Sequence, residues 1–561
     1  MNNNFPNKIT RTLARALAVA VFAASVGGFL GAGGYGGADG FGAAYAADVS
    51  PTADHMIRVH LSSLGSPSSI KAGIAGSYTI KSNGKAVSGT VTIAAKGSSG
   101  IKLTAGGTAY SLGKDIILKA ASQNVSNRIT LGGDDYPGDL RVINKSGKLK
   151  LVSHVDMETY VMGVVPYEVG DSKEYMEALK ANAVAARTFA YFFVNSSNRA
   201  SQEHDIVNTT AAQVYKGYDA SYKNANAAAS ATACQILTTP SGGEVLTCYS
   251  ASNGGHTEYP KSAGATASNF KYLPYKKDSY DLKYSLAHSS YSATVTIPKS
   301  LKASDLKNSG KQPYAMLREA MKAAGVNPSD LTSGSKVSVK EISLTNPRYS
   351  DNKTPRAYTG ADFTLGLPKM GSVAARDIVV KFAPYVDDGG TKRPFLNSKL
   401  GLANKSKFSM LYLRNDDSSY LLAAVRYGHS AGMSQVGSYQ MAKEGKKYKT
   451  ILKFYYLMGS QTKLVTKEWP IDNGVTAGPV PSGADSSAEK KTKKTAYPFK
   501  AKVKITSGTL TVRSGPGTKY KKLGSLKKNS KITVKGAKSS WYRITFKGKK
   551  AYVAKRYIKK I

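Results

Sequence analysis

The chain is poor in cysteine, tryptophan, histidine and acidic residues. Its 561 residues include 2 cysteines, 2 tryptophans, 7 histidines, and 36 Asp and Glu against 79 Lys and Arg. Cys234 and Cys248 have only His256 as a further ligand nearby, so no four-ligand spacing for zinc exists. The two cysteines flank a turn signal at 240–243. A disulfide across a hairpin and two buried thiols are the open alternatives.

The shortage of acidic residues leaves a formal net charge of +43. Such a surface attracts polyanions, namely nucleic acid, anionic lipid or acidic polymers of a bacterial wall, or it simply keeps the protein soluble. The abundant residues are 54 glycines and 35 tyrosines, and the hydrophobic content is 41%. This composition indicates a folded, turn-rich β protein with room for two or more domains.

Long apolar runs are scarce, and the most prominent one lies near the N-terminus. Lys8, Arg11 and Arg15 precede an apolar stretch over 16–30, and 44–46 reads Ala-Tyr-Ala. We predict a signal peptide over 1–46 and a short linker over 47–56, with a retained N-terminal membrane anchor as the alternative. Export places the protein in the cell wall or outside the cell, which argues against nucleic acid as a partner.

The rest of the chain predicts an α+β protein in several parts. Alternating apolar runs between Gly, Asn and Ser turns predict a β-rich part over 57–147. Helical and strand patterns mix over 148–464, including a helix at 315–324. Residues 465–498 are predicted to form a flexible linker, and 499–561 a small basic β-barrel. Residues 299–404 match no recognisable block.

An alanine-rich helix is predicted in the body. Asp171 is expected to cap it, with Glu174 closing a capping box. Apolar residues then recur at helical spacing and predict one buried stripe, made of Met176, Leu179, Ala183, Ala186, Ala190 and Phe193. Alanine at these positions lets another backbone approach closely.

Several ordered blocks carry a family resemblance. They read YPGDL at 136–140, GVVPYEV at 163–169, EALKANAVAARTFA at 177–190, QVYKG at 213–217, SASNGGHTE at 250–258 and GHSAGMSQ at 428–435. Together they resemble the SpoIID/LytB family of stage II sporulation protein D and amidase-enhancer proteins. The strand start IRVHL at 57–61 also resembles the opening of that family.

The resemblance implies a lytic transglycosylase that cuts peptidoglycan glycan strands, with Glu168 as the catalytic acid and base. One carboxylate suffices if the substrate's own hydroxyl attacks, whereas ordinary glycoside hydrolases need two. Adjacent valines would raise the pKa of Glu168, whereas the following helix would lower it. Glu158 and Glu177 are expected to be structural. The predicted substrate-binding residues are Lys180, Arg187, Gln213, Tyr215, Ser252, Gly254, Gly255, Thr257, His429, Ser434 and Gln435.

The sequence argues against two further kinds of site, a zinc site and an esterase active site. Some relatives hold zinc where this chain has Val207, Ala211 and Ala212, so we expect no metal there and no cofactor. The Gly-x-Ser-x-Gly pattern at 428–432 is typical of an esterase nucleophile elbow, with Ser430 as the nucleophile. That fold needs a later histidine, and none follows Ser430.

The C-terminal part resembles a bacterial SH3-type domain, through LTVRSGPG at 510–517, WYRI at 541–544 and AYV at 551–553. Trp541, Tyr542 and Tyr552 are the predicted wall-binding residues, and the lysines are expected to attract anionic wall polymers. The sequence thus favours an exported glycan-strand lyase targeted to the wall. The alternatives are a non-catalytic enhancer of a separate cell-wall amidase and a wall-binding protein in which Glu168 is inactive.

Overall fold

The computed structural model describes residues 55–196, 199–258, 270–349, 355–382, 409–471, 473–475, 497–505, 508–517, 520–538 and 541–560. They form two compact units that divide after Ser482, and each unit has its own hydrophobic core. The class is mixed α+β with an all-β C-terminal unit, which confirms the predicted fold class. The predicted signal peptide lies outside the described residues. No helix in the described ranges is long and apolar enough to cross a membrane.

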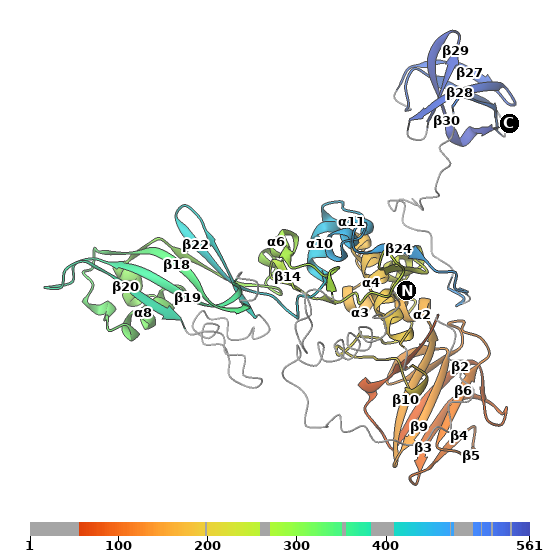
Figure 1. Cartoon of the computed structure of the whole chain (residues 1–561), viewed down its shortest axis with the longest axis horizontal. Coiled ribbons are helices and arrows are strands. Elements are labelled where there is room, and N and C mark those ends of the chain that lie inside the picture. Colours follow the sequence, from red (N-terminus) through yellow and green to blue (C-terminus); the bar gives the residue numbers. More distant parts are fainter. Residues whose placement is uncertain are drawn as a thin grey trace, which may run out of the picture. The chain divides into compact units, whose positions relative to one another are not determined.

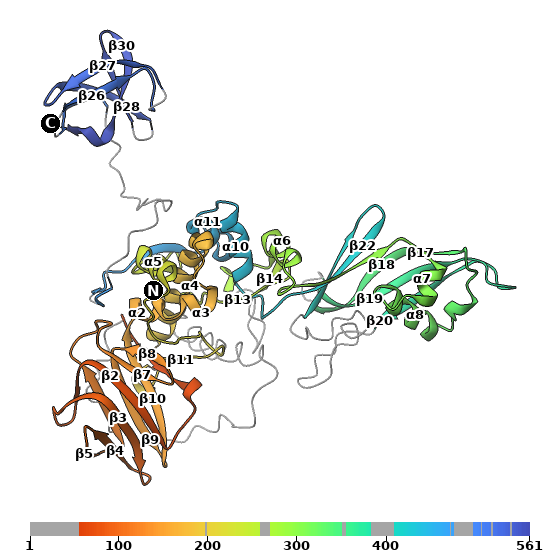
Figure 2. The same ribbon diagram turned by 180° about the vertical axis from the view of Figure 1, so that it is seen from behind.

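The N-terminal part of the first unit is one large, mostly antiparallel sheet (Figures 1 and 2, red to orange). Its strand order is β11-β1-β10-β9-β6-β2-β3-β4-β5, with β7 beside β2 and β8 beside β7. Alternating apolar residues form the strands, because one sheet face is buried. The strands are β1 (Met56–His60), β2 (Ser69–Ile80), β3 (Ala86–Lys96), β4 (Gly100–Ala105), β5 (Thr108–Leu112), β6 (Asp115–Ala120), β7 (Arg128–Leu131), β8 (Asp134–Pro137), β9 (Asp139–Lys145), β10 (Lys148–Asp156) and β11 (Ile206–Val207).

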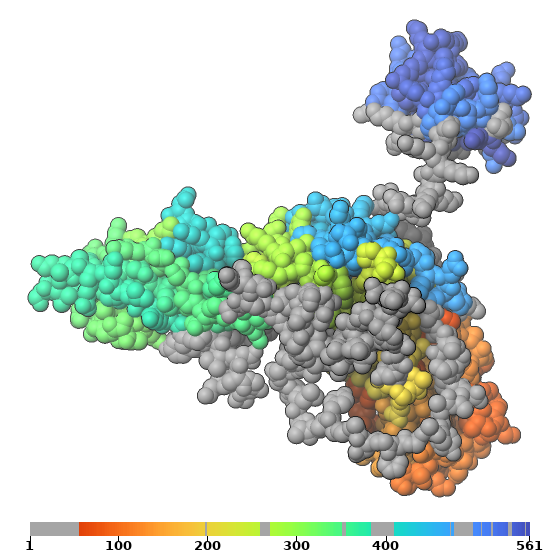
Figure 3. Space-filling model, in the orientation of Figure 1, coloured from red at the N-terminus to blue at the C-terminus, as the bar shows by residue number. Residues whose placement is uncertain are grey.

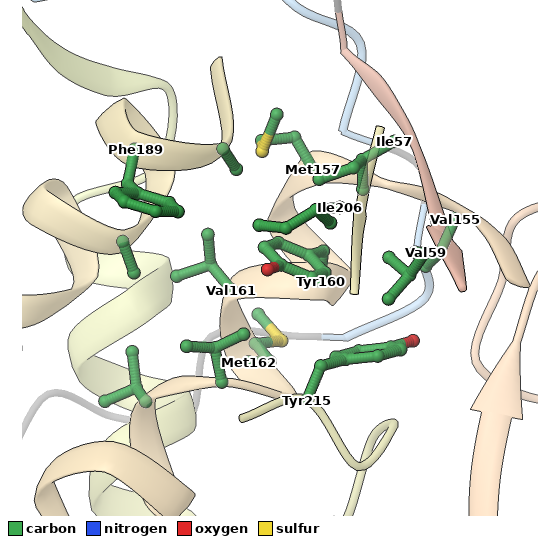
Figure 4. Packing of buried hydrophobic residues seen from close by; sticks show 14 of the residues in the cluster. Ile57, Val59, Val155, Met157, Tyr160, Val161, Met162, Phe189, Ile206 and Tyr215 are labelled. Carbon is green, nitrogen blue, oxygen red and sulfur yellow. The ribbon is translucent and has the colours of Figure 1, made fainter. Parts of the chain in front are cut away.

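Helices follow directly from β10. Asp156 caps α2 by accepting hydrogen bonds from the backbone N–H groups of Glu158 and Thr159. The helices of this layer are α2 (Met157–Met162), α3 (Val165–Val169), α4 (Met176–Val194) and α5 (Lys223–Ala231). Figure 4 shows Tyr160 of α2 pointing into the core between the strands and α4, with Tyr215 nearby. The ring centroids of these two tyrosines lie 5.0 Å apart.

Helix α4 differs from its prediction in two ways. It begins at Met176 without a side-chain cap, because the Asp171 carboxylate instead accepts the Ala225 N–H at 2.6 Å. Asp171 therefore ties the segment before α4 to α5. The helix is also buried around its whole circumference, since only Met176, Glu177 and Phe193 of its residues are not buried. Alanine-rich α5 packs against it, and this close approach requires small side chains.

Short strand pairs and three helices complete the body. They are β12 (Gln235–Thr238) with β24 (Lys463–Thr466), β13 (Tyr249–Ser250) with β23 (Met433–Ser434), β14 (His256–Thr257) with β15 (Lys276–Lys277), and helices α6 (Ser279–Ala287), α10 (Gln435–Lys443) and α11 (Tyr448–Tyr456). Lys283 of α6 pairs with Glu444 just after α10 at 2.9 Å. The surfaces of these segments meet in Figure 3, where they are yellow-green and light blue.

The predicted linker starts later than residue 465. Val465 pairs with Ile236 in the β12–β24 ladder, and the Trp469 ring lies 5.6 Å from that of Tyr191. Apolar residues therefore hold this segment on the body through Trp469. Cys234 and Cys248 are both buried free thiols. The predicted turn forms, with an antiparallel bridge between Thr238 and Glu244, but it does not join the two cysteines in a disulfide.

The body is interrupted by a module that has its own core. Its strands are β16 (Ala293–Pro298), β17 (Ser300–Lys302), β18 (Lys336–Tyr349), β19 (Arg356–Leu367), β20 (Arg376–Phe382), β21 (Met410–Asn415) and β22 (Ser419–Val425), and its helices include α7 (Ala303–Asn308) and α8 (Tyr314–Ala323). Helix α8 matches the helix predicted at 315–324 within one residue. Arg356 contacts both carboxylate oxygens of Glu258, at 2.8 and 3.0 Å, which joins this module to the body.

The second unit is a sheet of order β27-β26-β30-β29-β28-β25-β31. Its strands are β25 (Phe499–Val503), β26 (Thr509–Arg513), β27 (Lys522–Lys527), β28 (Lys531–Lys538), β29 (Trp541–Phe546), β30 (Lys549–Ala554) and β31 (Ile558–Lys560). Inward-facing Ala501, Val503, Val512, Val534 and Val553 are fully buried and form its core.

Candidate functional site

Glu168 lies on the short helix α3. Pro166 stands in the first turn of this helix, where its fixed φ favours helical backbone. Gly170 ends the helix with a φ of +71°, a conformation that costs glycine little. The carboxylate is thereby carried on one short helical turn.

Two segments far apart in the chain donate hydrogen bonds to the Glu168 carboxylate. The backbone N–H of Val214 donates to Oε1 at 2.9 Å, and the Gln435 side-chain Nε2 donates to Oε2 at 3.1 Å. Val214 belongs to the 213–217 block, whereas Gln435 is the first residue of α10. Three blocks of the family pattern therefore meet at one carboxylate.

Burial dominates the electrostatics of this carboxylate. Desolvation raises the pKa of Glu168 to about 7, although the hydrogen bonds from Val214 and Gln435 favour the ionised form and oppose the rise. Within the described ranges Glu168 forms no ion pair. The residue as a whole keeps intermediate exposure, although its carboxyl group is desolvated. A carboxyl group that is protonated near neutral pH can act as a proton donor.

Aromatic side chains surround this position. The Tyr439 hydroxyl donates to the backbone oxygen of Val169 at 3.1 Å, next to Glu168. Its ring stacks on that of Tyr175, with 4.7 Å between centroids, and Tyr284 lies 5.7 Å from Tyr439. Tyrosine rings offer flat apolar faces with a polar edge. A cluster of tyrosine rings therefore lies next to Glu168, in contact with the backbone of the following residue.

Comparisons with known proteins agree with these blocks. Residues 145–239, which include Glu168, match the family profile described as stage II sporulation protein, and residues 508–559 match the bacterial SH3 domain. The chain carries a SpoIID domain and a bacterial SH3 domain. The resemblance predicted from the sequence is therefore confirmed for these two ranges.

Three curated relatives extend the similarity beyond the SpoIID domain. The amidase enhancer of Bacillus subtilis (strain 168) is 30% identical over 355 residues, which cover 61% of this chain and 46% of that protein. Stage II sporulation protein D of the same organism is 28% identical over 326 residues, covering 54% and 74%. An uncharacterized protein of Brachyspira hyodysenteriae is 26% identical over 330 residues, covering 58% and 72%. The chain thus spans about half the length of the amidase enhancer.

Two residues of the SpoIID domain that were predicted to bind substrate form buried ion pairs instead. Arg187 is fully buried and donates to both oxygens of Glu158, at 2.8 and 2.6 Å. Lys180 is also buried and pairs with Glu177 at 2.9 Å, and Glu177 also accepts the Tyr448 N–H. Glu158 and Glu177 therefore have the structural roles that the sequence predicts. Arg187 and Lys180 hold α4 in the fold and do not line the surface beside Glu168.

The 213–217 block supports the site mainly through its backbone. The buried Gln213 side chain accepts from the Tyr160 hydroxyl and donates to the Tyr249 hydroxyl, both at 2.8 Å. Tyr215 is fully buried against Tyr160. These two predicted substrate contacts are therefore packing residues that fix Val214 between them. The sequence block points to this segment but not to the N–H group that touches Glu168.

The 428–435 loop contributes one residue to the carboxylate and several to its support. His429 Nε2 lies 2.9 Å from the Tyr249 carbonyl oxygen, and its Nδ1 accepts the Ala431 N–H at 3.0 Å. Both ring nitrogens therefore bond to the backbone, and burial lowers the pKa of His429 to about 4. Gly432 has a φ of +71°, and a Cβ there would lie 2.0 Å from the Cys248 oxygen. The loop thus packs tightly on β13, and the backbone takes up both ring nitrogens of its histidine.

The SASNGGHTE block is likewise a support. Ser252 is buried beside Asp281, and Thr257 donates to the Pro274 oxygen at 2.6 Å. Gly254 and Gly255 have φ values of +68° and +100°, and side chains there would meet Arg426 and Leu282. Of the predicted binding residues, Gln435 is the one whose side chain the structure brings to Glu168.

Two buried carboxylates escaped the sequence reasoning. Asp281 accepts the Ser434 hydroxyl at 2.6 Å and the Asn253 N–H at 2.8 Å, whereas Asp278 accepts the Tyr455 hydroxyl at 2.7 Å. Burial raises the pKa of both. Ser434 in turn caps α10 by accepting the Gly437 N–H. This network fixes the first turn of α10, and hence Gln435. The Asp-x-x-Asp spacing before α6 is a helix-start signal that would have indicated Asp278.

The predicted aromatic platform of the SH3 domain is divided between two faces. Trp541 and Tyr542 are consecutive on β29, so they point to opposite sides of the sheet. Tyr542 packs edge-on against Phe499 at 5.6 Å, on the core side. Tyr552 is nearly buried and pairs in register with Arg543, on the same face as Trp541. The three aromatic rings therefore form no single surface.

Proposed function

We propose that this protein is a peptidoglycan lytic transglycosylase that associates with the cell wall, with Glu168 as its single acid and base. The observation that carries the proposal is a carboxyl group whose pKa burial raises to about 7, held by donors from two distant segments. The SpoIID and SH3 domains support a cell-wall-associated role.

One carboxyl group is enough for the reaction because no water is consumed. Protonated Glu168 gives its proton to the glycosidic oxygen as the bond from that oxygen to the anomeric carbon breaks. The resulting carboxylate then takes the proton from the muramyl hydroxyl, whose oxygen forms the new bond to the same carbon. The products are a shortened strand and an anhydromuramyl end, and Glu168 is protonated again.

The Val214 N–H and Gln435 amide have a role in the second half of this cycle. Both donate to the ionised carboxylate, so they lower the energy of the state that follows proton donation. They also fix both oxygens, which keeps one lone pair directed to the substrate. The proposed reaction needs no positively charged side chain beside Glu168. A lysine or arginine in contact would keep the Glu168 carboxyl group ionised.

A second candidate is favoured by a relative's name. The amidase enhancer is 30% identical over the matched residues, so this chain is an alternative candidate for stimulating a separate wall amidase. In that function Glu168 would have no catalytic role.

The decisive experiment is digestion of purified glycan strands, both with and without stem peptides. Wild-type protein is expected to release anhydromuramyl products, and Glu168→Gln to release at least about 100-fold less. Glu177→Gln is the matched control, because this carboxylate pairs with Lys180 away from the donors of Glu168. No products from the wild type, together with faster cleavage by an added amidase, would favour the enhancer.

A further inference from the structure

The C-terminal unit has an unusual charge distribution. Between Lys490 and Ile561 the sequence contains no aspartate and no glutamate, although lysines occur on every strand but β29 and β26. The cations of strands β25 to β31 therefore have no acidic side chain within residues 490–561 to pair with. A folded domain of this composition carries uncompensated positive charge on its surface.

Three of these lysines lie side by side across neighbouring strands. The registers pair Lys502 of β25 with Lys531 of β28 on one side and with Lys559 of β31 on the other. Residues in register on antiparallel strands share a face, about 5 Å apart at their Cβ atoms. Ala501 and Val503 on either side of Lys502 are fully buried, so the three lysines face away from the core. We call Lys502, Lys531 and Lys559 the lysine row.

The lysine row weakens the isolated fold. Like charges that face each other across strands are destabilising. In the part of the chain that the structure describes, none of the three ammonium groups makes a hydrogen bond or an ion pair. Lys500, two residues before Lys502 on the same face, extends the positive surface and contacts Thr533.

We propose that the lysine row binds a flexible polymer whose backbone carries phosphodiester charges. Lysine ammonium groups are point charges on flexible stems, which suits phosphates at variable spacing. Carboxylates prefer the guanidinium fork, but Arg513 and Arg543 donate to the backbone oxygens of Tyr520 and Lys535. The row spans about 10 Å across three strands, which fits a single chain.

A membrane surface fits this face less well. Peripheral membrane binding combines cations with inserted apolar side chains. Phe499, on the same strand as Lys502, is buried on the core side and has Lys560 over its face at 5.2 Å from the ring centroid. The row therefore presents charge without an apolar anchor. This inference specifies the wall-targeting part of the proposed function and does not depend on the lyase activity.

The test compares two full-length variants that lose the same charge. The row variant carries Lys502→Gln, Lys531→Gln and Lys559→Gln. The control carries Lys521→Gln, Lys527→Gln and Lys549→Gln, of which Lys527 faces Thr509 and Lys549 faces Phe546. Binding to poly(glycerol phosphate) is measured between 50 and 300 mM salt.

The row variant is expected to bind at least tenfold more weakly at 50 mM salt, and the control less than threefold. The slope of log K against log salt should fall by about 2 in the row variant, since each phosphate contact contributes about 0.7 for a single strand. The row variant should also melt at a higher temperature at low salt, which shows that it folds. Equal losses in the two variants would overturn the proposal.

Binding of other ligands shows which kind of charged molecule the lysine row recognises. A single-stranded oligonucleotide with the same number of phosphates tests the shared chemistry, and row-dependent binding of either polymer supports the proposal. Tighter binding to vesicles of anionic lipid, or binding to phosphate-free peptidoglycan that the row variant retains, would overturn it. Soluble glycan strands report lyase activity separately, so failure of one proposal leaves the other testable.

Discussion

Glu168 has a different environment from the buried carboxylates of the body that form ion pairs with arginine. Glu158, Glu258 and Asp205 each form an ion pair with an arginine. Glu168 has only a backbone N–H and an amide as donors in the described part of the chain. The fold thus keeps the Glu168 carboxyl group near its point of half-protonation at neutral pH, at a cost in stability, and burial acts in the same direction on Asp281.

Because the raised pKa costs stability, replacing Glu168 is expected to stabilise the fold while it removes the proposed activity. The folded state holds the Glu168 proton up to about pH 7, whereas the unfolded chain loses it near its ordinary value of 4.5. Stability contributed by this group is therefore lost as pH rises from about 4.5 to 7. Glu168→Gln should raise the melting temperature relative to wild type, and more at pH 8 than at pH 5.

Glu203 provides a control of opposite sign. Lys145 and Lys150 hold its pKa at about 2, so it stabilises the fold above about pH 4.5 and loses this effect as pH falls towards 2. Glu203→Gln should lower the melting temperature at pH 8, with a smaller difference at pH 3. A uniform shift of Glu168→Gln at all pH values would contradict the raised pKa.

Single residues also show the limit of sequence reasoning. Glu168 and Gln435 were both predicted from motifs, and they are in contact. Arg187 and Tyr215 belong to equally strong motifs, yet they are buried in the core. A motif does not distinguish a side chain kept for packing from one kept for chemistry. The Val214 N–H could not be predicted, because a backbone donor has no residue type.

At the scale of elements, tertiary contacts override local signals. The capping pattern at Asp171 is a valid helix start, but the carboxylate binds the Ala225 N–H and α4 begins five residues later. Alternation in the N-terminal strands predicted their existence correctly, because each buries one face. Helix α4 is held by the Arg187–Glu158 pair, which joins it to α2 with no exposure of the arginine.

Breaking this ion pair is expected to cause a large loss of stability, part of which a second substitution recovers. Arg187→Met should lower the free energy of unfolding by about 3–5 kcal/mol, because Glu158 is left buried and unpaired. Adding Glu158→Gln should recover much of the loss, since an amide keeps an acceptor for the Cys234 N–H. Lys283→Met is the control, because its exposed pair with Glu444 is worth at most about 1 kcal/mol. Denaturant unfolding measures all four proteins.

At the scale of the whole molecule, the chain combines units with separate cores. The SpoIID body and the SH3 domain have no shared core, and residues 476–496 between them are rich in polar residues. The module that includes β18 and β19 has a third core, which the sequence did not indicate because residues 299–404 match no recognisable block. Its strands were only expected as part of the body, since a separate core depends on long-range pairing.

Separate cores predict that catalysis and wall binding can be separated. A chain that ends at residue 475 keeps Glu168, Val214 and Gln435, so its rate on soluble glycan strands should equal that of the full chain. On intact cell walls at low salt it should act at least tenfold more slowly, because the lysine row is absent. Raising the salt should bring the full chain down to the truncated rate, since screening weakens charge attraction. Equal rates of the truncated and full chains on walls at low salt would show that the SH3 domain does not concentrate the protein there. A lower rate of the truncated chain on soluble strands would place part of the proposed catalytic site in the removed segment.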